Sequence, residues 1–99
     1  MSFVVAQPEM LAAGAGTLSV IVSGMTARNA AAAAPTTGVV PAAADEVSVL
    51  TAAHFAAHGV SYQAVSAQAA AVHEMFVTTL GTSAGSYAAT EAANAITAG

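Results

Sequence analysis

The pair of residues best suited to binding a metal ion is His54 and His58, four positions apart. On a helix this spacing places both imidazoles on one side, where their nitrogens could face one ion. His73 lies 15 residues beyond His58. That is about 22 Å along a helix, so His73 cannot complete the same site without a second chain or a sharp break. His73-Glu74 also lacks the second histidine of a zinc protease motif. We therefore expect packed or solvent-edge histidines and no metal site.

A possible nucleophile is Ser83, because residues 81–85 match the pattern Gly-x-Ser-x-Gly of a hydrolase nucleophile elbow. That elbow needs a strand before the serine, and an acid and a histidine later in the chain. Here a predicted helix precedes the serine, and no histidine follows it. We interpret the two glycines as a helix end and expect no catalysis and no cofactor.

Two further groups of polar residues have simpler roles. Asp45 and Glu46 are adjacent, so on a helix they point apart and do not form a catalytic carboxylate pair. They are typical of a helix start, with Asp45 as the cap. Tyr87 and Glu91 are four positions apart and would share one side of a helical tail. In a tail of mostly small residues, these two side chains are the ones best able to contact a receptor.

Composition predicts a small helical domain that is short of polar surface. The chain has 99 residues, many of them alanine, and only 6% are charged. An ordinary soluble domain has about 25% charged residues. The mean hydropathy is +0.70, so a lone monomer would expose much apolar area, and we expect a partner or a membrane to cover it.

The charge balance excludes one class of partner. The net charge is −4, and Arg28 is the single basic residue. A basic patch that could neutralise phosphates is therefore missing, and we expect no nucleic-acid binding. Arg28 either forms an interface ion pair or lies in solvent near a helix C-terminus. With no cysteine in the chain, disulfides and thiolate metal sites are excluded.

Proline and glycine divide the chain into two predicted helices. After a short extended lead (residues 1–7), Pro8 and Glu9 suit the first turn of a helix over residues 8–34. Residues 35–44, which contain Pro35 and Pro41, form the connector. The second helix covers residues 45–80 and ends at Gly81 and Gly85, and residues 81–99 form a frayed helix or a disordered tail. The fold class is all-α, an antiparallel two-helix hairpin.

Apolar residues recur at helical spacing on both predicted helices. The second helix also carries another run, largely alanine, between Val49 and Ala71. One hairpin mate cannot cover both sides, so we expect a four-helix bundle with another chain. The residues predicted to bind the partner are Leu11, Leu18, Ile21, Val22, Met25, Val47, Leu50, Phe55, Val65, Val72, Met75 and Phe76.

A membrane is the alternative to a protein partner. Residues 10–27 carry no charge, and this stretch is just long enough to span a bilayer. Small and hydroxylated residues dominate it, however, and no positive anchors flank its start. A membrane-active helical hairpin therefore remains the second hypothesis. The residues before Leu11 also lack the positive charge of a cleavable secretory signal, so export would need another route.

Taken together, these motifs resemble those of the mycobacterial PE proteins. The resemblance rests on Pro8-Glu9, on the connector and cap over residues 40–48, and on Tyr87-x-x-x-Glu91. It covers essentially the whole chain, since the motifs follow one another in the expected order. Two small departures are Ala42, where many relatives have a second proline, and Glu91, the less common of the two acids. Some PE proteins carry long C-terminal extensions, so this chain could be the N-terminal piece of one.

The resemblance implies a non-enzymatic subunit that pairs with a PPE protein in a four-helix bundle. It also implies export by a type VII (ESX) secretion system, with Tyr87 and Glu91 as the export signal. An EspG-type chaperone would bind the PPE subunit in the cytoplasm and contact this chain only indirectly. After export the protein would be secreted or lie at the cell surface.

Overall fold

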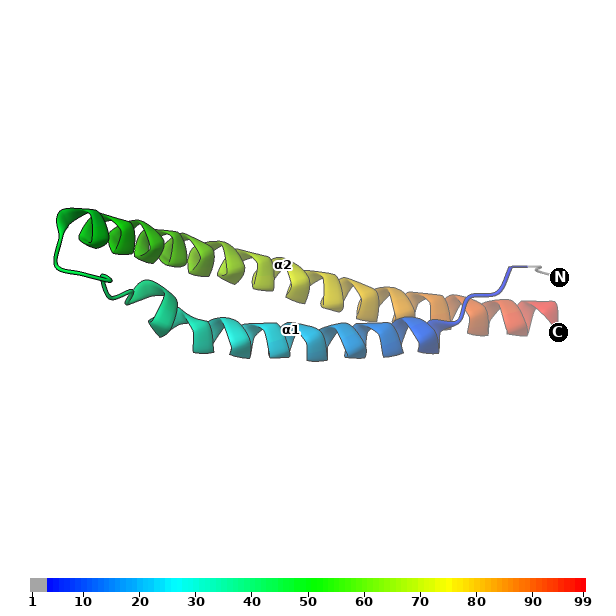
Figure 1. Cartoon of the computed structure of the whole chain (residues 1–99). Helices are drawn as coiled ribbons and strands as arrows, with labels where there is room; N and C mark the ends of the chain where they lie inside the picture. Colours follow the sequence, from blue (N-terminus) through cyan, green and yellow to red (C-terminus); the bar gives the residue numbers. More distant parts are fainter. Residues whose placement is uncertain (1–3) are drawn as a thin grey trace. The chain divides into compact units, whose positions relative to one another are not determined.

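The structure is a computed structural model that describes residues 4–99. It contains two helices, α1 (Pro8–Thr37) and α2 (Glu46–Ala98), and the described residues contain no strand (Figure 1). The all-helical prediction is confirmed, and the two helices are those of a helical hairpin. Residues 4–7 of the predicted extended lead are not helical, and the first three lie outside the described residues.

The chain divides into two compact units, each built from part of α1 and part of α2. Unit 1 comprises Met1–Val22 and His73–Gly99, and unit 2 comprises Ser23–Val72. In unit 2, α1 and α2 lie antiparallel, because Asn29 pairs with Tyr62 whereas the later Thr36 meets the earlier Gly59. In unit 1, the lead at Ala6 meets α2 at Glu91.

Both helix starts agree with their sequence signals. α1 begins at Pro8, and the carbonyl oxygen of Gln7 accepts the first hydrogen bond from the N–H of Met10 at 3.0 Å. Asp45 caps α2: its Oδ2 accepts the backbone N–H of Ser48 at 3.1 Å, and its Oδ1 accepts the Ser48 hydroxyl at 2.7 Å. These bonds satisfy donors that a helix N-terminus leaves without a helical partner.

Both helix ends differ from the prediction. α1 continues past the predicted end at residue 34 and includes Pro35, and α2 continues through Gly81 and Gly85 to Ala98. Proline removes one backbone donor, but the last turn of α1 gains two side-chain bonds: the hydroxyls of Thr36 and Thr37 donate to the carbonyl oxygens of Ala32 and Ala33 at 2.6 and 2.7 Å. The connector is therefore residues 38–45. Of the two alternatives for the region after Gly81, a frayed helix or a disordered tail, the structure shows a helix, because residues 81–98 continue α2.

The core consists of small side chains. Ala15, Val22 and Ala84 are the buried apolar residues of unit 1, and Ala52 is that of unit 2, with exposures of 6–7%. Gly59 is also buried. A methyl group added there would lie 2.5 Å from the carbonyl oxygen of Thr36, so the backbones of α1 and α2 approach closely at this point.

Candidate partner-binding surface and signal residues

In unit 2, α2 packs against α1 mainly through small and polar residues. The less exposed positions, spaced three or four apart, are Ser48, Ala52, Ala56, Gly59, Gln63, Ser66 and Ala70. In unit 1 the same spacing continues through His73, Val77, Leu80 and Ala84. Such a repeat is typical of packed helix pairs. Most of these positions could not be singled out from the sequence, because large apolar residues define the hydrophobic pattern and these residues are small or polar.

Two side chains of α2 fix its register against α1 in unit 2. The Tyr62 hydroxyl donates to Oδ1 of Asn29 at 2.7 Å, and Nε2 of Gln63 donates to the backbone carbonyl oxygen of the same Asn29 at 2.9 Å. A slip of either helix would break both bonds. No spacing rule singles out Asn29, so its contacts with Tyr62 and Gln63 could not be predicted from the sequence.

The larger apolar residues of α2 are mostly exposed. In unit 2, Phe55 and Tyr62 are 64% and 50% exposed, and Val65 and Val72 are 64% and 62% exposed. Each pair is seven residues apart, which places its members on one side of a helix. The exposed residues of the predicted partner-binding set are Ile21, Met25, Val47, Leu50, Phe55, Val65, Val72, Met75 and Phe76.

The remaining three members of that set lie mainly within the chain's own packing. Leu11 and Leu18 are half-buried in unit 1, and Val22 is 7% exposed. Val22 therefore has little surface to offer a partner. Leu11, Leu18 and Val22 therefore serve the packing of the chain itself first, whereas Ile21 and Met25 on the same helix stay exposed.

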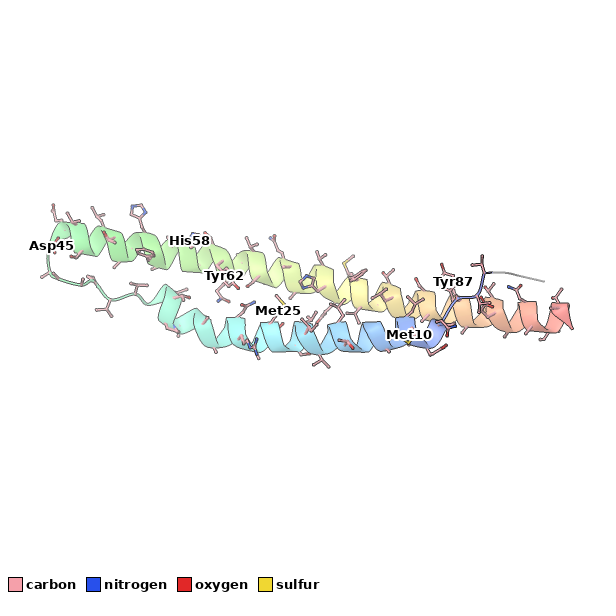
Figure 2. The ribbon with its side chains drawn as sticks, turned by 45° about the vertical axis from the view of Figure 1, so that its right-hand side comes forward. Met10, Met25, Asp45, His58, Tyr62 and Tyr87 are labelled. Carbon is pink, nitrogen blue, oxygen red and sulfur yellow. The ribbon has the colours of Figure 1, made fainter. Side chains whose placement is uncertain are left out.

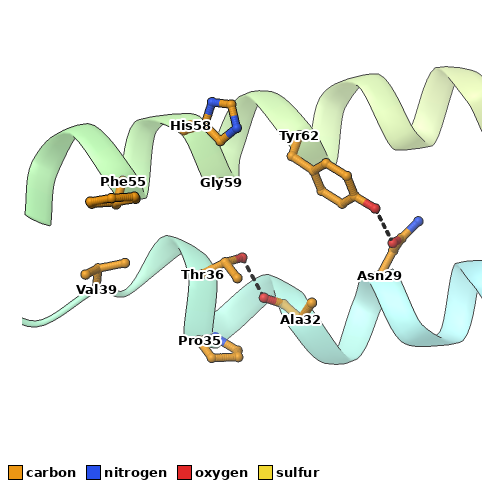
Figure 3. A pocket seen from close by; sticks show the side chains of 9 residues that line it. All are labelled: Asn29, Ala32, Pro35, Thr36, Val39, Phe55, His58, Gly59 and Tyr62. Carbon is orange, nitrogen blue, oxygen red and sulfur yellow. Dashed lines mark hydrogen bonds between the residues drawn. The ribbon is translucent and has the colours of Figure 1, made fainter.

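A hollow lies between the two helices of unit 2 (Figure 3). Its volume is about 550 Å³, and the side chains around it are mostly apolar. Phe55 and Tyr62 stand on the α2 side, Val39 contributes from the connector, and His58 lies beside Gly59. The lining residues are Asn29, Ala32, Pro35, Thr36, Val39, Phe55, His58, Gly59 and Tyr62. Phe55, a predicted partner-binding residue, thus borders a cavity of a size that can accept a bulky apolar side chain.

Among the described residues, the histidines, Ser83 and Asp45 form neither a metal site nor a nucleophile elbow. His54 and His58 are exposed, and the described residues contain no group of three or more metal-ligating side chains close enough to hold an ion. Ser83 lies inside α2, so Gly-x-Ser-x-Gly forms no strand-to-helix elbow. Asp45 acts as a cap, and the hydroxyl and backbone N–H of Ser48 hold the pKa of its carboxyl below the ordinary value of 3.8.

Tyr87 and Glu91 lie on the last part of α2, one turn apart. Tyr87 is 51% exposed and borders a hollow of about 350 Å³ whose other lining residues carry hydroxyl groups, namely Thr82, Ser83, Ser86 and Thr90. Glu91 is half-buried, and its Oε1 accepts a hydrogen bond of 3.0 Å from the backbone N–H of Ala6. The sequence offered no indication of this contact, because its partners are 85 residues apart.

A comparison with models of protein families shows to which family the chain belongs. Residues 4–94 match the model of the PE family. The chain belongs to the PE family. It is 70% identical over 98 residues to the PE family protein PE13 of Mycobacterium tuberculosis, and the match covers 99% of each chain. This confirms the resemblance to mycobacterial PE proteins.

Other PE relatives are longer than this chain. It is 58% identical over 94 residues to the PE family protein PE8 of M. tuberculosis, and the match covers 34% of that protein. With the PE-PGRS family protein PE_PGRS8 of the same organism it shares 60% identity over 95 residues, which cover 54% of the relative. The PE domain therefore also occurs as part of larger proteins.

The first helix of the PE domain meets a simple test for membrane spans. α1 contains an 18-residue window with a mean hydropathy of 1.5, of which 11% is buried. By length and composition alone, this one helix of the described chain could cross a bilayer. Core helices of soluble proteins and signal sequences pass the same test.

Proposed function

We propose that this chain is the PE subunit of an obligate heterodimer with a PPE protein, and that the dimer is exported by a type VII (ESX) secretion system. In this proposal the PE hairpin contributes two helices of a four-helix bundle and catalyses no reaction. An EspG-type chaperone holds the complex in the cytoplasm through the PPE subunit. The exported protein is then secreted or lies at the cell surface.

The observation that supports this proposal best is the amount of exposed surface. The chain exposes 7181 Å², whereas a folded monomer of 9.5 kDa is expected to expose about 5,000 Å². The excess of about 2,000 Å² is larger than the area of about 800 Å² that one partner buries in a standard interface. Because large apolar side chains account for part of this surface, water alone is a poor environment for the chain.

The hollow of unit 2 suggests how a partner helix could be held. Its mostly apolar lining, with Phe55 and Tyr62 on one side, suits a bulky apolar side chain of the PPE subunit. Filling such a cavity with an anchor residue is a common source of binding energy in protein interfaces. The register bonds of Asn29 keep the two walls of the hollow in place before binding.

Expression with and without the partner tests the proposal. We expect the chain expressed alone to aggregate or to melt without cooperativity, and a pull-down from a mycobacterial host to recover a PPE protein in a one-to-one complex. A monodisperse chain that melts cooperatively as a monomer would contradict the obligate heterodimer.

The export signal of the proposal consists of Tyr87 and Glu91. Because both belong to unit 1 and neither lines the hollow of unit 2, Tyr87→Ala and Glu91→Ala should leave the heterodimer intact. We expect both variants to remain in the cell, as measured by the protein in culture filtrate relative to cell lysate. Export of both at the parental level would remove the signal from the proposal.

A membrane-active hairpin is the second candidate, and the apolar window of α1 is the observation that favours it. Flotation with liposomes separates the two candidates, because an inserted hairpin rises with the vesicles at high salt. We expect the heterodimer to stay at the bottom of the gradient, since its partner covers the apolar surface that would enter the bilayer.

A further inference from the structure

The N-terminal lead of the PE chain, residues 4–7, contacts the last part of α2. The backbone N–H of Ala6 donates a hydrogen bond of 3.0 Å to Oε1 of Glu91. Glu91 is half-buried, while the residues that follow it on α2 are exposed. In Figure 2 the lead passes α2 beside Tyr87. The contact thus joins the lead to the predicted export signal.

The chemistry of this contact depends on residue 91 and on the backbone at residue 6. A carboxylate that accepts a main-chain N–H forms a charge-assisted hydrogen bond, which is stronger than a bond between neutral groups. Any residue except proline supplies the same donor at position 6. An alanine at position 91 would remove the acceptor, while a glutamine would keep an uncharged one at the same reach.

The lead and the signal present one joint surface. Tyr87 is 51% exposed one turn before Glu91, and the side chains of Val4 and Val5 are 82% and 65% exposed on the lead. Glu91, by contrast, is half-buried and already uses one oxygen to hold the lead. A receptor that binds Tyr87 therefore meets the lead next to it, and the Glu91 carboxylate is the group that keeps the lead in place.

We propose that Glu91 is a positioning residue of the signal: it anchors the lead against α2, and the export receptor binds Tyr87 together with the anchored lead. This inference rests on the proposed function, because it assigns Glu91 its task within the export signal. It makes the two ends of the PE chain parts of one recognition surface.

Replacement of the donor tests this inference without touching Glu91. Ala6→Pro removes the N–H, and residue 6 lies outside both helices, where a proline interrupts no helical hydrogen bond. Ala6→Ser is the matched control, since it changes the same position and leaves the backbone N–H intact. We expect Ala6→Pro to lower export as much as Glu91→Ala does, Ala6→Ser to export near the parental level, and the double variant Ala6→Pro/Glu91→Ala to be no worse than either single one.

A second readout follows the lead itself. We expect amide hydrogen exchange at Ala6 to accelerate about tenfold or more in Glu91→Ala, the factor expected for loss of a hydrogen bond to a charged group. It is measured on the full chain, purified with the partner that it retains. Glu91→Gln should show intermediate protection and intermediate export, because its amide oxygen still accepts the Ala6 N–H more weakly. A merely structural role for Glu91 would not make export follow the protection of Ala6.

Two results would overturn the inference. One is parental export of Ala6→Pro while Glu91→Ala is retained, which would mean that the receptor reads Glu91 directly and would leave the proposed signal intact. The other is a Glu91→Gln variant with a protected Ala6 amide and no export, which would make the charge itself the recognised feature. Parental export of Glu91→Ala and Tyr87→Ala would instead contradict the proposed signal.

Discussion

Gly59 is the residue at which the backbones of α1 and α2 come closest in unit 2. A Cβ atom at this position would lie 2.5 Å from the carbonyl oxygen and 3.0 Å from the carbonyl carbon of Thr36. Both atoms belong to the backbone, so no side-chain rotation can relieve the contact. Unlike most glycines of this chain, Gly59 is therefore required by close packing and not by chain flexibility.

We expect Gly59→Ala to destabilise the hairpin by about 1–3 kcal/mol, the usual effect of adding volume to a packed contact. The matched control is Gly81→Ala, which lies inside the same helix with nothing within 4 Å of its added methyl group. That change should stabilise the helix by about 0.5–1 kcal/mol, because alanine replaces glycine without strain. Denaturant unfolding followed by helical circular dichroism measures both. Equal effects of the two substitutions would show that the close approach at Gly59 is absent in solution.

At the scale of elements, helix starts could be predicted and helix ends could not. The starts at Pro8 and Asp45 rest on local chemistry, since a cap or a proline acts within one turn. The ends depend on packing: a glycine costs a helix about 1 kcal/mol relative to alanine, which a tertiary contact can offset. Ala84 is buried between Gly81 and Gly85, so contacts in unit 1 keep α2 helical there.

The residues through which α2 contacts other helices could likewise be predicted only in part. The helical spacing of large apolar residues such as Phe55 and Val65 predicts a surface that binds a partner chain. Both residues are exposed in the chain alone. The contact within the hairpin uses Gly59, Gln63 and alanines, whose small size permits close approach. A hydropathy pattern does not detect a helix contact made by such small and polar residues. The hydrogen bond between Ala6 and Glu91 cannot be predicted from the sequence either.

The cap of α2 makes helix stability dependent on pH. The Ser48 hydroxyl and backbone N–H favour the ionised Asp45 carboxyl and hold its pKa below 3.8. Because the folded pKa is the lower one, the stabilisation is complete above pH 3.8 and is lost as the pH falls through the folded pKa. We expect Asp45→Asn, which keeps a capping oxygen but does not titrate, to flatten this part of the pH profile of the thermal midpoint. Identical profiles of parent and variant between pH 2 and pH 5 would contradict the assignment.

At the scale of the whole molecule, partner binding by the exposed apolar surface has to be tested with substitutions that leave the fold of the hairpin intact. Leu18 is unsuitable for this purpose, because it is half-buried and a charge there would also disturb the contact of α1 with α2. Phe76 is 52% exposed, so Phe76→Asp leaves the packing of the chain itself largely unchanged. Gln68→Asp adds the same charge at an exposed position outside the predicted partner-binding set.

We expect Phe76→Asp to weaken the complex with the PPE partner by about 3 kcal/mol, more than a hundredfold in Kd, because an unpaired carboxylate would enter a dry interface. Gln68→Asp should bind within about threefold of the parent, since isolated surface charges contribute little. Co-purification followed by titration calorimetry measures both. If Phe76→Asp binds as tightly as Gln68→Asp, this part of α2 faces solvent in the complex, and the partner must cover the chain elsewhere.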